Sequence, residues 1–206
     1  DILFITGGNT DPASRFRVLQ YLPYFKKMGY DVNHFHPFPS YSFRPKTKNR
    51  YYFWFLIYMA RFLRSISYFI CFLSLKKYKI IFCNRALLTK NNFLENYLFK
   101  YKNKLVFDFD DAIYLPDQHD RIKKYIKNAF FVTPGNRVLS DFALLENPSL
   151  EIIPTVIDTT LYKEKINITN SLVKVGWSGS WDTMRFALPM IKPIIYDLYK
   201  EIDFEF

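Results

Sequence analysis

Cysteine is scarce in this chain of 206 residues, which contains only Cys71 and Cys83. Both lie inside apolar runs, so they do not suggest a disulfide framework or a zinc knuckle, whose cysteines are more numerous and closely spaced. So little cysteine fits a reducing compartment, and we therefore expect a cytoplasmic protein.

An uninterrupted apolar run that could cross a membrane is also missing. In the segment YYFWFLIYMARFLRSISYFICFLSL, from Tyr51 to Leu75, Arg61 and Arg64 leave apolar runs of about ten residues, whereas a crossing needs about 20. We expect a helix that does not span. Its arginines fit a core helix with one solvent-exposed face, or a helix that also rests on a membrane surface.

Acidic residues are scarce between Tyr41 and Lys104, where Glu95 is the single acid among fourteen lysines and arginines. The whole chain carries a net charge of +10. Two explanations stay open. A codon bias toward Lys, Asn, Ile, Phe and Tyr would produce much of the excess of basic residues. Alternatively, the basic residues bind an anionic partner such as a phosphate-bearing ligand, a lipid headgroup surface or nucleic acid.

Six short apolar runs predict strands, and they lack the alternation of a sheet with one wet face. They cover residues 2–6, 79–84, 104–111, 129–134, 151–156 and 173–180. Helical patterns cover residues 13–28, 51–75, 91–101, 118–128 and 136–145. This alternation predicts an α/β protein with a Rossmann-like, doubly wound parallel sheet that is covered on both faces.

The predicted sheet occupies residues 1–157, and residues 158–171 are polar and non-periodic, as in a linker. Residues 172–206 supply a strand, a helix interrupted by Pro189 and Pro193, and the beginning of another strand. Three elements cannot enclose a core, so we expect the start of a second Rossmann-like domain. The chain has no initiating Met and stops inside an apolar run, which suggests a fragment of a longer protein.

Small and polar residues directly follow the predicted strands, which is where open α/β sheets bind ligands. Gly7 and Gly8 let the backbone approach a ligand, and the helix after them offers N–H groups to phosphate. Arg15 and Arg17 in its first turns suit bidentate phosphate contacts. The GxGxxG spacing is absent, so a dinucleotide site is not supported, and a tight turn with solvent-facing arginines explains the same residues.

The stretch LVFDFDDAIYL ends a predicted strand with three carboxylates, Asp108, Asp110 and Asp111. Three roles for such a cluster stay open. It could bind a divalent metal through the Asp-x-Asp pair, act as a general base or hydroxyl-binding group whose pKa is raised by the neighbouring acids, or cap the next turn. We favour substrate hydroxyl or base chemistry. Side-chain alternation would place Asp108 and Asp110 on one face and turn Asp111 away.

Three histidines and one turn complete the candidate residues. His119 would line the same cleft or lie on the surface, whereas His34 and His36 lack the third ligand that a metal needs. A second candidate phosphate cradle opens the last helix. It consists of Ser178, Gly179, Ser180 and Thr183.

Five segments in a fixed order carry a resemblance to a known family. They are PASRFRVLQYLPYFKKMGYDV, FDFDDAIYL, FFVTPGNRVLSDFA, IIPTVIDTTLY and VGWSGSWDT. Together they resemble the GT-B glycosyltransferases of the group 1 type, which are retaining enzymes that transfer a sugar from a nucleotide donor. The resemblance spans nearly the whole chain.

The resemblance implies roles for the candidate residues. Residues 1–157 would be the acceptor-side domain, the donor domain would start at residue 172, and Asp110 and Asp111 would be catalytic. An acid stands where the family usually has a histidine, and the family's E-x7-E donor motif would lie beyond Phe206, so the 206 residues alone would be inactive. Donor-phosphate contacts would come from Gly7, Gly8, Arg15, Ser178, Gly179, Ser180 and Thr183. Acceptor contacts would come from Asp108, His119 and Asn136.

The expected function is sugar transfer from a nucleoside diphosphate to a glycan or lipid-linked acceptor in surface polysaccharide synthesis, with no obligatory metal or other cofactor. The basic, apolar region of residues 41–104 would then contact the inner face of the plasma membrane. Two alternatives stay open. One is a metal-dependent GT-A transferase that uses Asp108 and Asp110, and the other is a non-enzymatic basic module, although no nucleic-acid motif is present.

Overall fold

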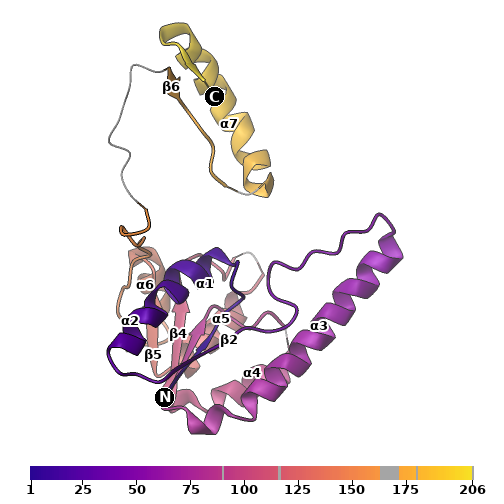
Figure 1. Cartoon of the computed structure of the whole chain (residues 1–206), viewed down its shortest axis with the longest axis vertical. Coiled ribbons are helices and arrows are strands. Elements are labelled where there is room, and N and C mark those ends of the chain that lie inside the picture. Colours follow the sequence, from indigo (N-terminus) through magenta and orange to yellow (C-terminus); the bar gives the residue numbers. More distant parts are fainter. Residues whose placement is uncertain (90, 116, 163–171, 180, 206) are drawn as a thin grey trace. The chain divides into compact units, whose positions relative to one another are not determined.

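The computed structural model describes residues 1–89, 91–115, 117–162, 172–179 and 181–205 (Figure 1). The chain divides into two compact units, Asp1–Asp158 and Thr159–Phe206. The division falls beside the predicted boundary at residue 157. Of the predicted site residues, Ser180 lies outside the described part of the chain.

The first unit contains a five-stranded sheet in which every described strand pair is parallel. The strands are β1 (Ile2–Ile5), β2 (Val32–Phe35), β3 (Ile80–Asn84), β4 (Leu105–Phe109) and β5 (Phe131–Pro134). Their order is β2-β1-β3-β4-β5. The predicted α/β class and parallel sheet are confirmed, and the order is one of those found in doubly wound folds, with a topological switch point between β1 and β3.

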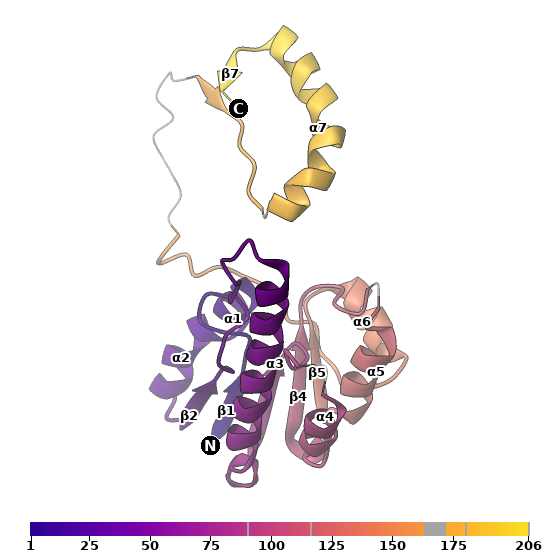
Figure 2. The same cartoon turned by 90° about the vertical axis from the view of Figure 1, so that its right-hand side faces the viewer.

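Helices connect these strands and lie on both sides of the sheet (Figures 1 and 2). They are α1 (Pro12–Arg17), α2 (Leu22–Lys27), α3 (Arg50–Phe72), α4 (Asn92–Phe99), α5 (His119–Asn128) and α6 (Arg137–Leu144). The larger core joins one sheet face to α3, α4, α5 and α6 through side chains such as Phe107, Tyr68 and Tyr125. A smaller core joins the other face to α1 and α2 around Phe4 and Val18.

The face under α1 and α2 is less completely covered than the sequence predicts. Ile80 is 40% exposed there, and Val106 of β4 and Phe131 of β5 are half-buried. An apolar depression of about 330 Å³ lies on this face between Phe25, Phe82 and Val106. The continuous apolar runs predicted two covered faces, but α1 and α2 are six residues each and cover only part of the sheet.

Two predicted elements differ from the observed ones because of proline. The helix expected over residues 13–28 is broken into α1, a 3₁₀ turn at Leu19–Tyr21 and α2, whose first turn contains Pro23. The strand expected over residues 151–156 is not formed. Its backbone does follow β5, with Ile153 N donating to Pro134 O at 3.0 Å, but Pro154 has no N–H with which to continue the ladder.

The second unit is a β-α-β arrangement. Strands β6 (Val173–Lys174) and β7 (Phe204–Glu205) pair in parallel, and α7 (Trp181–Glu201) connects them. The predicted interruption of this helix is wrong, because α7 contains Pro189 and Pro193 and continues through both. The two carbonyls that these prolines cannot bond belong to the exposed residues Arg185 and Pro189, where water can reach them.

Candidate functional site

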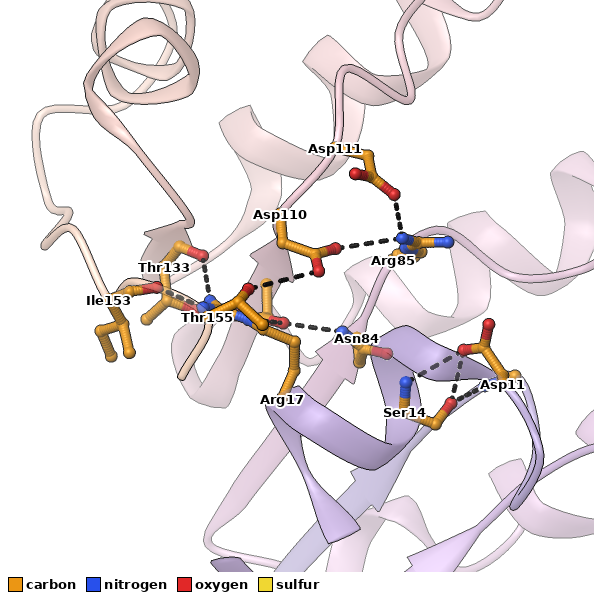
Figure 3. A network of polar contacts seen from close by, with 12 residues as sticks. Asp11, Ser14, Arg17, Asn84, Arg85, Asp110, Asp111, Thr133, Ile153 and Thr155 are labelled. Atoms are coloured by element: carbon orange, nitrogen blue, oxygen red, sulfur yellow. Dashed lines mark hydrogen bonds and ion pairs between the residues drawn. The ribbon is translucent and has the colours of Figure 1, made fainter. Parts of the chain in front are cut away.

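A buried ion pair lies at the carboxyl ends of the central strands (Figure 3). The guanidinium of Arg17 in α1 contacts both carboxylate oxygens of Asp108 in β4, and the two side chains are 3% and 1% exposed. Asn84 Nδ2 and Thr133 Oγ1 also donate to this carboxylate, each at 2.7 Å. Four elements are thereby joined, because Asn84 ends β3 and Thr133 belongs to β5.

These contacts give Asp108 a structural role. Its two oxygens accept four hydrogen bonds from protein groups, so a ligand could reach it only by displacing them. Arg17 is equally committed, since it also donates to the carbonyls of Ile153 and Thr133. The sequence placed Asp108 among the acceptor contacts and left Arg17 as either suited to phosphate or solvent-facing, and the burial of both leaves neither side chain exposed to a ligand or to solvent.

A second arginine–carboxylate cluster lies nearby and is more open. Arg85, which directly follows β3, contacts Asp110 at 3.1 Å and also Asp111. The side chains of Arg85, Asp110 and Asp111 are 25%, 14% and 65% exposed. Burial alone would lower the pKa of Arg85, but the attractions of Asp110 and Asp111 outweigh it and raise the pKa. Because these side chains are partly exposed, solvent reaches this cluster.

The expected alternation of the three aspartates is not observed. Strand β4 ends at Phe109, so Asp110 and Asp111 no longer follow the two-residue period and both reach Arg85. The backbone of Arg85 has a φ of 65°, which is rare for a residue with a side chain. Such a backbone conformation costs free energy and persists only where the surroundings enforce it, here through the two carboxylates that hold the side chain.

Gly135 explains how the loop after β5 packs against Asp110. A Cβ atom at this position would lie 2.9 Å from Asp110 Cα, so only glycine allows the two backbones to approach this closely. Gly135 N donates to Phe109 O at 2.9 Å. The next residue, Asn136, is exposed, and its Oδ1 caps α6 by accepting a hydrogen bond from Leu139 N. The sequence predicted that Asn136 contacts the sugar acceptor, but this oxygen is already used by the helix.

The loop after β1 has a different use from the one expected. The carboxylate of Asp11 accepts from Ser14 N at 3.0 Å and Ser14 Oγ at 2.7 Å, so a negative charge already occupies the amino terminus of α1. A phosphate there would meet this carboxylate. Gly8 has a φ of 143°, and a Cβ on it would lie 2.8 Å from Ser40 Cβ, so the glycines allow residues 40 and 41 to pack closely over the loop.

Arg15 and the histidines lie apart from the two aspartate clusters. Arg15 is exposed with its guanidinium near the ring of Phe16, and His119 is exposed beside Asp120 at the start of α5. His34 Nε2 bonds Thr6 Oγ1 at 2.8 Å, and burial together with His36 lowers its pKa to about 4. Among the residues that the structure describes, no three His, Cys, Asp or Glu side chains form a metal-binding group.

A cavity of about 280 Å³ opens at the switch point between β1 and β3. Its lining includes Gly7 and Tyr41 on the β1 side, Tyr68 of α3, Arg121 of α5, and the adjacent residues Asn84 and Arg85. Its volume is close to the lower end of the range of about 300–1,000 Å³ for small-molecule sites. Cys83 also lines the cavity, but burial raises the pKa of its thiol, which argues against a thiolate nucleophile.

Two polar atoms of this lining are buried without a hydrogen-bond partner among the described residues. They are Asn84 Oδ1, an acceptor, and Arg85 Nε, a donor. The Asn84 amide donates to Asp108 through Nδ2, which leaves Oδ1 on the other side of the amide group. Buried unpaired polar atoms are costly, and these two, an acceptor and a donor, belong to consecutive residues that both line the cavity.

A third ion pair shapes the cavity wall. Arg121 donates to Glu95 through Nε at 2.6 Å and to the carbonyls of Leu87 and Thr89 at 2.6 and 3.0 Å. These bonds fix the loop after Arg85. The sequence contains no signal for Arg121. It did place Asn84 and Arg85 among the polar residues that directly follow buried strands, but it assigned them no role.

The remaining predicted residues lie in the second unit. Ser178 and Thr183 are exposed in and after the turn that precedes α7. A Cβ on Gly179 would lie 3.1 Å from Thr183 Oγ1 and 3.0 Å from Trp177 Nε1, so the turn is tight at this glycine. The structure thus brings Gly179 and Thr183 together at the start of a long helix.

The fold and the cavity define an α/β protein with a Rossmann-like parallel sheet and a pocket of mixed polar and apolar lining at its switch point. No protein-family model, curated protein or solved structure matches the chain.

Proposed function

We propose that the chain is the acceptor-side part of a GT-B glycosyltransferase, which transfers a sugar from a nucleoside diphosphate to a glycan or lipid-linked acceptor. The observation that carries the proposal is the cavity with its unpaired Asn84 Oδ1 and Arg85 Nε. Sugars present hydroxyl groups that both donate and accept hydrogen bonds, so a bound sugar could supply the partners that these two atoms lack.

The open aspartate cluster supplies the chemistry. Asp110 is held beside the cavity residue Arg85, and its other oxygen accepts from Thr155 at a long 3.4 Å. A carboxylate in this state can accept a hydrogen bond from an incoming hydroxyl and remove its proton as the hydroxyl attacks. Asp111 is more exposed and keeps Arg85 paired when Asp110 turns to the ligand.

The metal-dependent alternative fits these residues poorly. It needs Asp108 and Asp110 to face one cation, but Asp108 already holds the guanidinium of Arg17, whose positive charge would repel a second cation. Asp110 faces Arg85 instead. The proposal therefore assigns no residue of this cluster to a metal.

The test compares sugar binding by the Asn84→Ala variant with binding by the wild-type chain, using saturation-transfer NMR with a panel of monosaccharides and short glycans. Loss of one hydrogen bond to a bound hydroxyl should weaken binding by about three- to tenfold. The matched control is Thr89→Val, because Thr89 Oγ1 is also buried and unpaired but Thr89 is not part of the cavity lining.

Two outcomes would count against the proposal. A wild-type chain that binds none of the sugars would remove its basis, and equal weakening by Asn84→Ala and Thr89→Val would indicate a general loss of structure. Salt-dependent binding of RNA or DNA without sugar binding would favour the basic module instead.

A further inference from the structure

The side of α3 that faces away from the sheet is an exposed apolar stripe. Its residues are spaced three or four apart, so they share one helix face, and they are between 40% and 65% exposed. They are Phe55, Tyr58, Phe62, Ile66, Phe69 and Leu73. A stripe of this size is unusual on a soluble monomer and marks an interaction surface.

The opposite side of α3 is packed on the domain. Tyr68 and Phe72 are about 1% exposed, and their rings contact Phe35 of β2 and Tyr97 of α4 at centroid distances of 5.6 and 6.2 Å. The helix is long and apolar enough to cross a membrane, and only 17% of its most apolar window is buried in the domain. Because Tyr68 and Phe72 belong to the sheet core, the carboxyl-terminal half of α3 cannot be surrounded by lipid.

Positive charge flanks the stripe at both ends. Arg44, Lys46, Lys48 and Arg50 precede the apolar part of α3, and Lys76, Lys77 and Lys79 follow it. No Asp or Glu occurs between Asp31 and Glu95 in the sequence. An apolar face with basic ends and exposed Tyr, Trp and Phe side chains has the composition of a helix that lies in the interface of an anionic membrane.

Pairing with a second copy of the chain would be opposed by these charges. In a parallel pair the basic ends of α3 would meet their equivalents, and in an antiparallel pair residues 44–50 would meet residues 76–79. Both arrangements bring like charges together without an acid in the segment to compensate them. A flat anionic surface has no such penalty.

We propose that α3 docks on the surface of an anionic lipid bilayer, with its exposed stripe in the headgroup region and the domain above it. The basic residues at the two ends then lie at the level of the lipid phosphates. This contact depends on α3 and its flanking basic residues, and it holds whether or not the chain transfers sugar.

Docking would also bring the cavity to the membrane, because α3 forms part of the cavity wall. Tyr68 lines the cavity from the buried side of the helix. Arg64 donates to the carbonyls of Pro39 and Ser40 at 2.7 and 2.8 Å, which holds the loop whose Tyr41 N donates to Gly7 O at 2.8 Å. If the proposed function holds, this connection gives a lipid-linked acceptor a short route to the cavity.

The experiment is co-sedimentation of the chain with vesicles of phosphatidylglycerol and, separately, of phosphatidylcholine. The test variant carries Phe55→Ser, Phe62→Ser and Phe69→Ser, all on exposed side chains, so the fold should survive and circular dichroism checks it. The control variant carries Phe130→Ser and Phe186→Ser, which are 63% and 81% exposed but lie outside α3. We expect the test variant to bind anionic vesicles at least about tenfold more weakly, and the control to bind as the wild type does.

Two further readouts fix the mode of binding. In a variant whose single tryptophan is Trp54, the emission should shift to the blue with anionic vesicles and stay unchanged with neutral ones. Raising the salt from about 0.1 to 1 M shortens the screening length from about 10 to 3 Å and should weaken binding. The proposal is overturned if the wild type binds no vesicles, if control and test variants bind equally, or if sedimentation velocity shows a wild-type dimer that the test variant loses.

Discussion

Two arginine–aspartate clusters occupy neighbouring positions at the end of β4, and they differ in access to solvent. The Arg17–Asp108 pair is almost fully buried and satisfied by Asn84 and Thr133, whereas Arg85 shares Asp110 and Asp111 with solvent. The same two residue types therefore serve two purposes within four positions of sequence. The buried Arg17–Asp108 pair holds the edge of the sheet together. In the partly exposed cluster, Asp110 can exchange its contact with Arg85 for one with a ligand.

The largest effect expected is from Asp108→Ala. It would leave the Arg17 guanidinium buried without its counter-charge, which typically costs about 3–5 kcal/mol of unfolding free energy. Urea unfolding followed by circular dichroism measures this loss. Asp111→Ala is the matched control, and because Asp111 is exposed we expect a change below about 1 kcal/mol. Equal losses in the two variants would refute the division into a closed and an open cluster.

Gly135→Ala tests whether the open cluster needs the close approach of two backbones. The added Cβ would lie 2.9 Å from Asp110 Cα, so the loop must move, and we expect a loss of about 1–3 kcal/mol in unfolding free energy. Gly176→Ala is the control, because no atom lies within 4 Å of the Cβ it would add. A Gly135 variant as stable as the Gly176 variant would contradict the observed packing.

Arg85 separates backbone strain from charge. Both Arg85→Ala and Arg85→Gly remove the contacts to Asp110 and Asp111, but only glycine adopts the φ of 65° without strain. The Gly variant should therefore be more stable than the Ala variant by about 1 kcal/mol in thermal or urea unfolding. Both variants should lose sugar binding. If the Ala variant is the more stable one, the backbone at this position is not strained.

The smallest effect concerns His34, which lies on β2 away from both clusters. Its folded-state pKa of about 4 is below the unfolded value of 6.5, so the unfolded chain takes up a proton first as the pH falls. Stability from the neutral ring is full above pH 6.5 and is lost as the pH falls toward 4. Because the ring is half-buried, solvent screening limits the loss to roughly 1 kcal/mol. His34→Gln should flatten this part of the pH profile, and an unchanged profile would exclude His34 as its source.

The sequence was sufficient to predict four of the five sheet strands and the edge at which polar residues gather. Strand β2 was not among the six apolar runs that predicted strands, and the strand predicted over residues 151–156 is not formed. Strands such as β3 and β4 appear as continuous apolar runs because parallel strands are buried on both faces, and the polar residues that follow them gather at one edge. The strand order could not be read from these local patterns. It depends on which runs pair, and β1 pairs with β3 across almost eighty intervening positions.

Which aspartate is buried and which is exposed depends on contacts with residues that are distant in the sequence. Asp108 is buried because Arg17, 91 positions earlier, and Thr133, 25 positions later, both reach it. Nothing in the local pattern FDFDD distinguishes that aspartate from its neighbours. Likewise, the positive φ of Arg85 has no sequence signal, because asparagine and glycine are the residues that usually mark such a conformation.

The segment that leaves the first unit crosses its polar edge and is tied down there. Ile153 O accepts from Arg17, Val156 O accepts from Gln20 at 2.9 Å, and Thr155 reaches Asp110. These ties couple the exit path of the chain to both aspartate clusters. Breaking these ties would therefore loosen both clusters at once, because a single stretch of four residues, 153–156, contacts Arg17, Gln20 and Asp110.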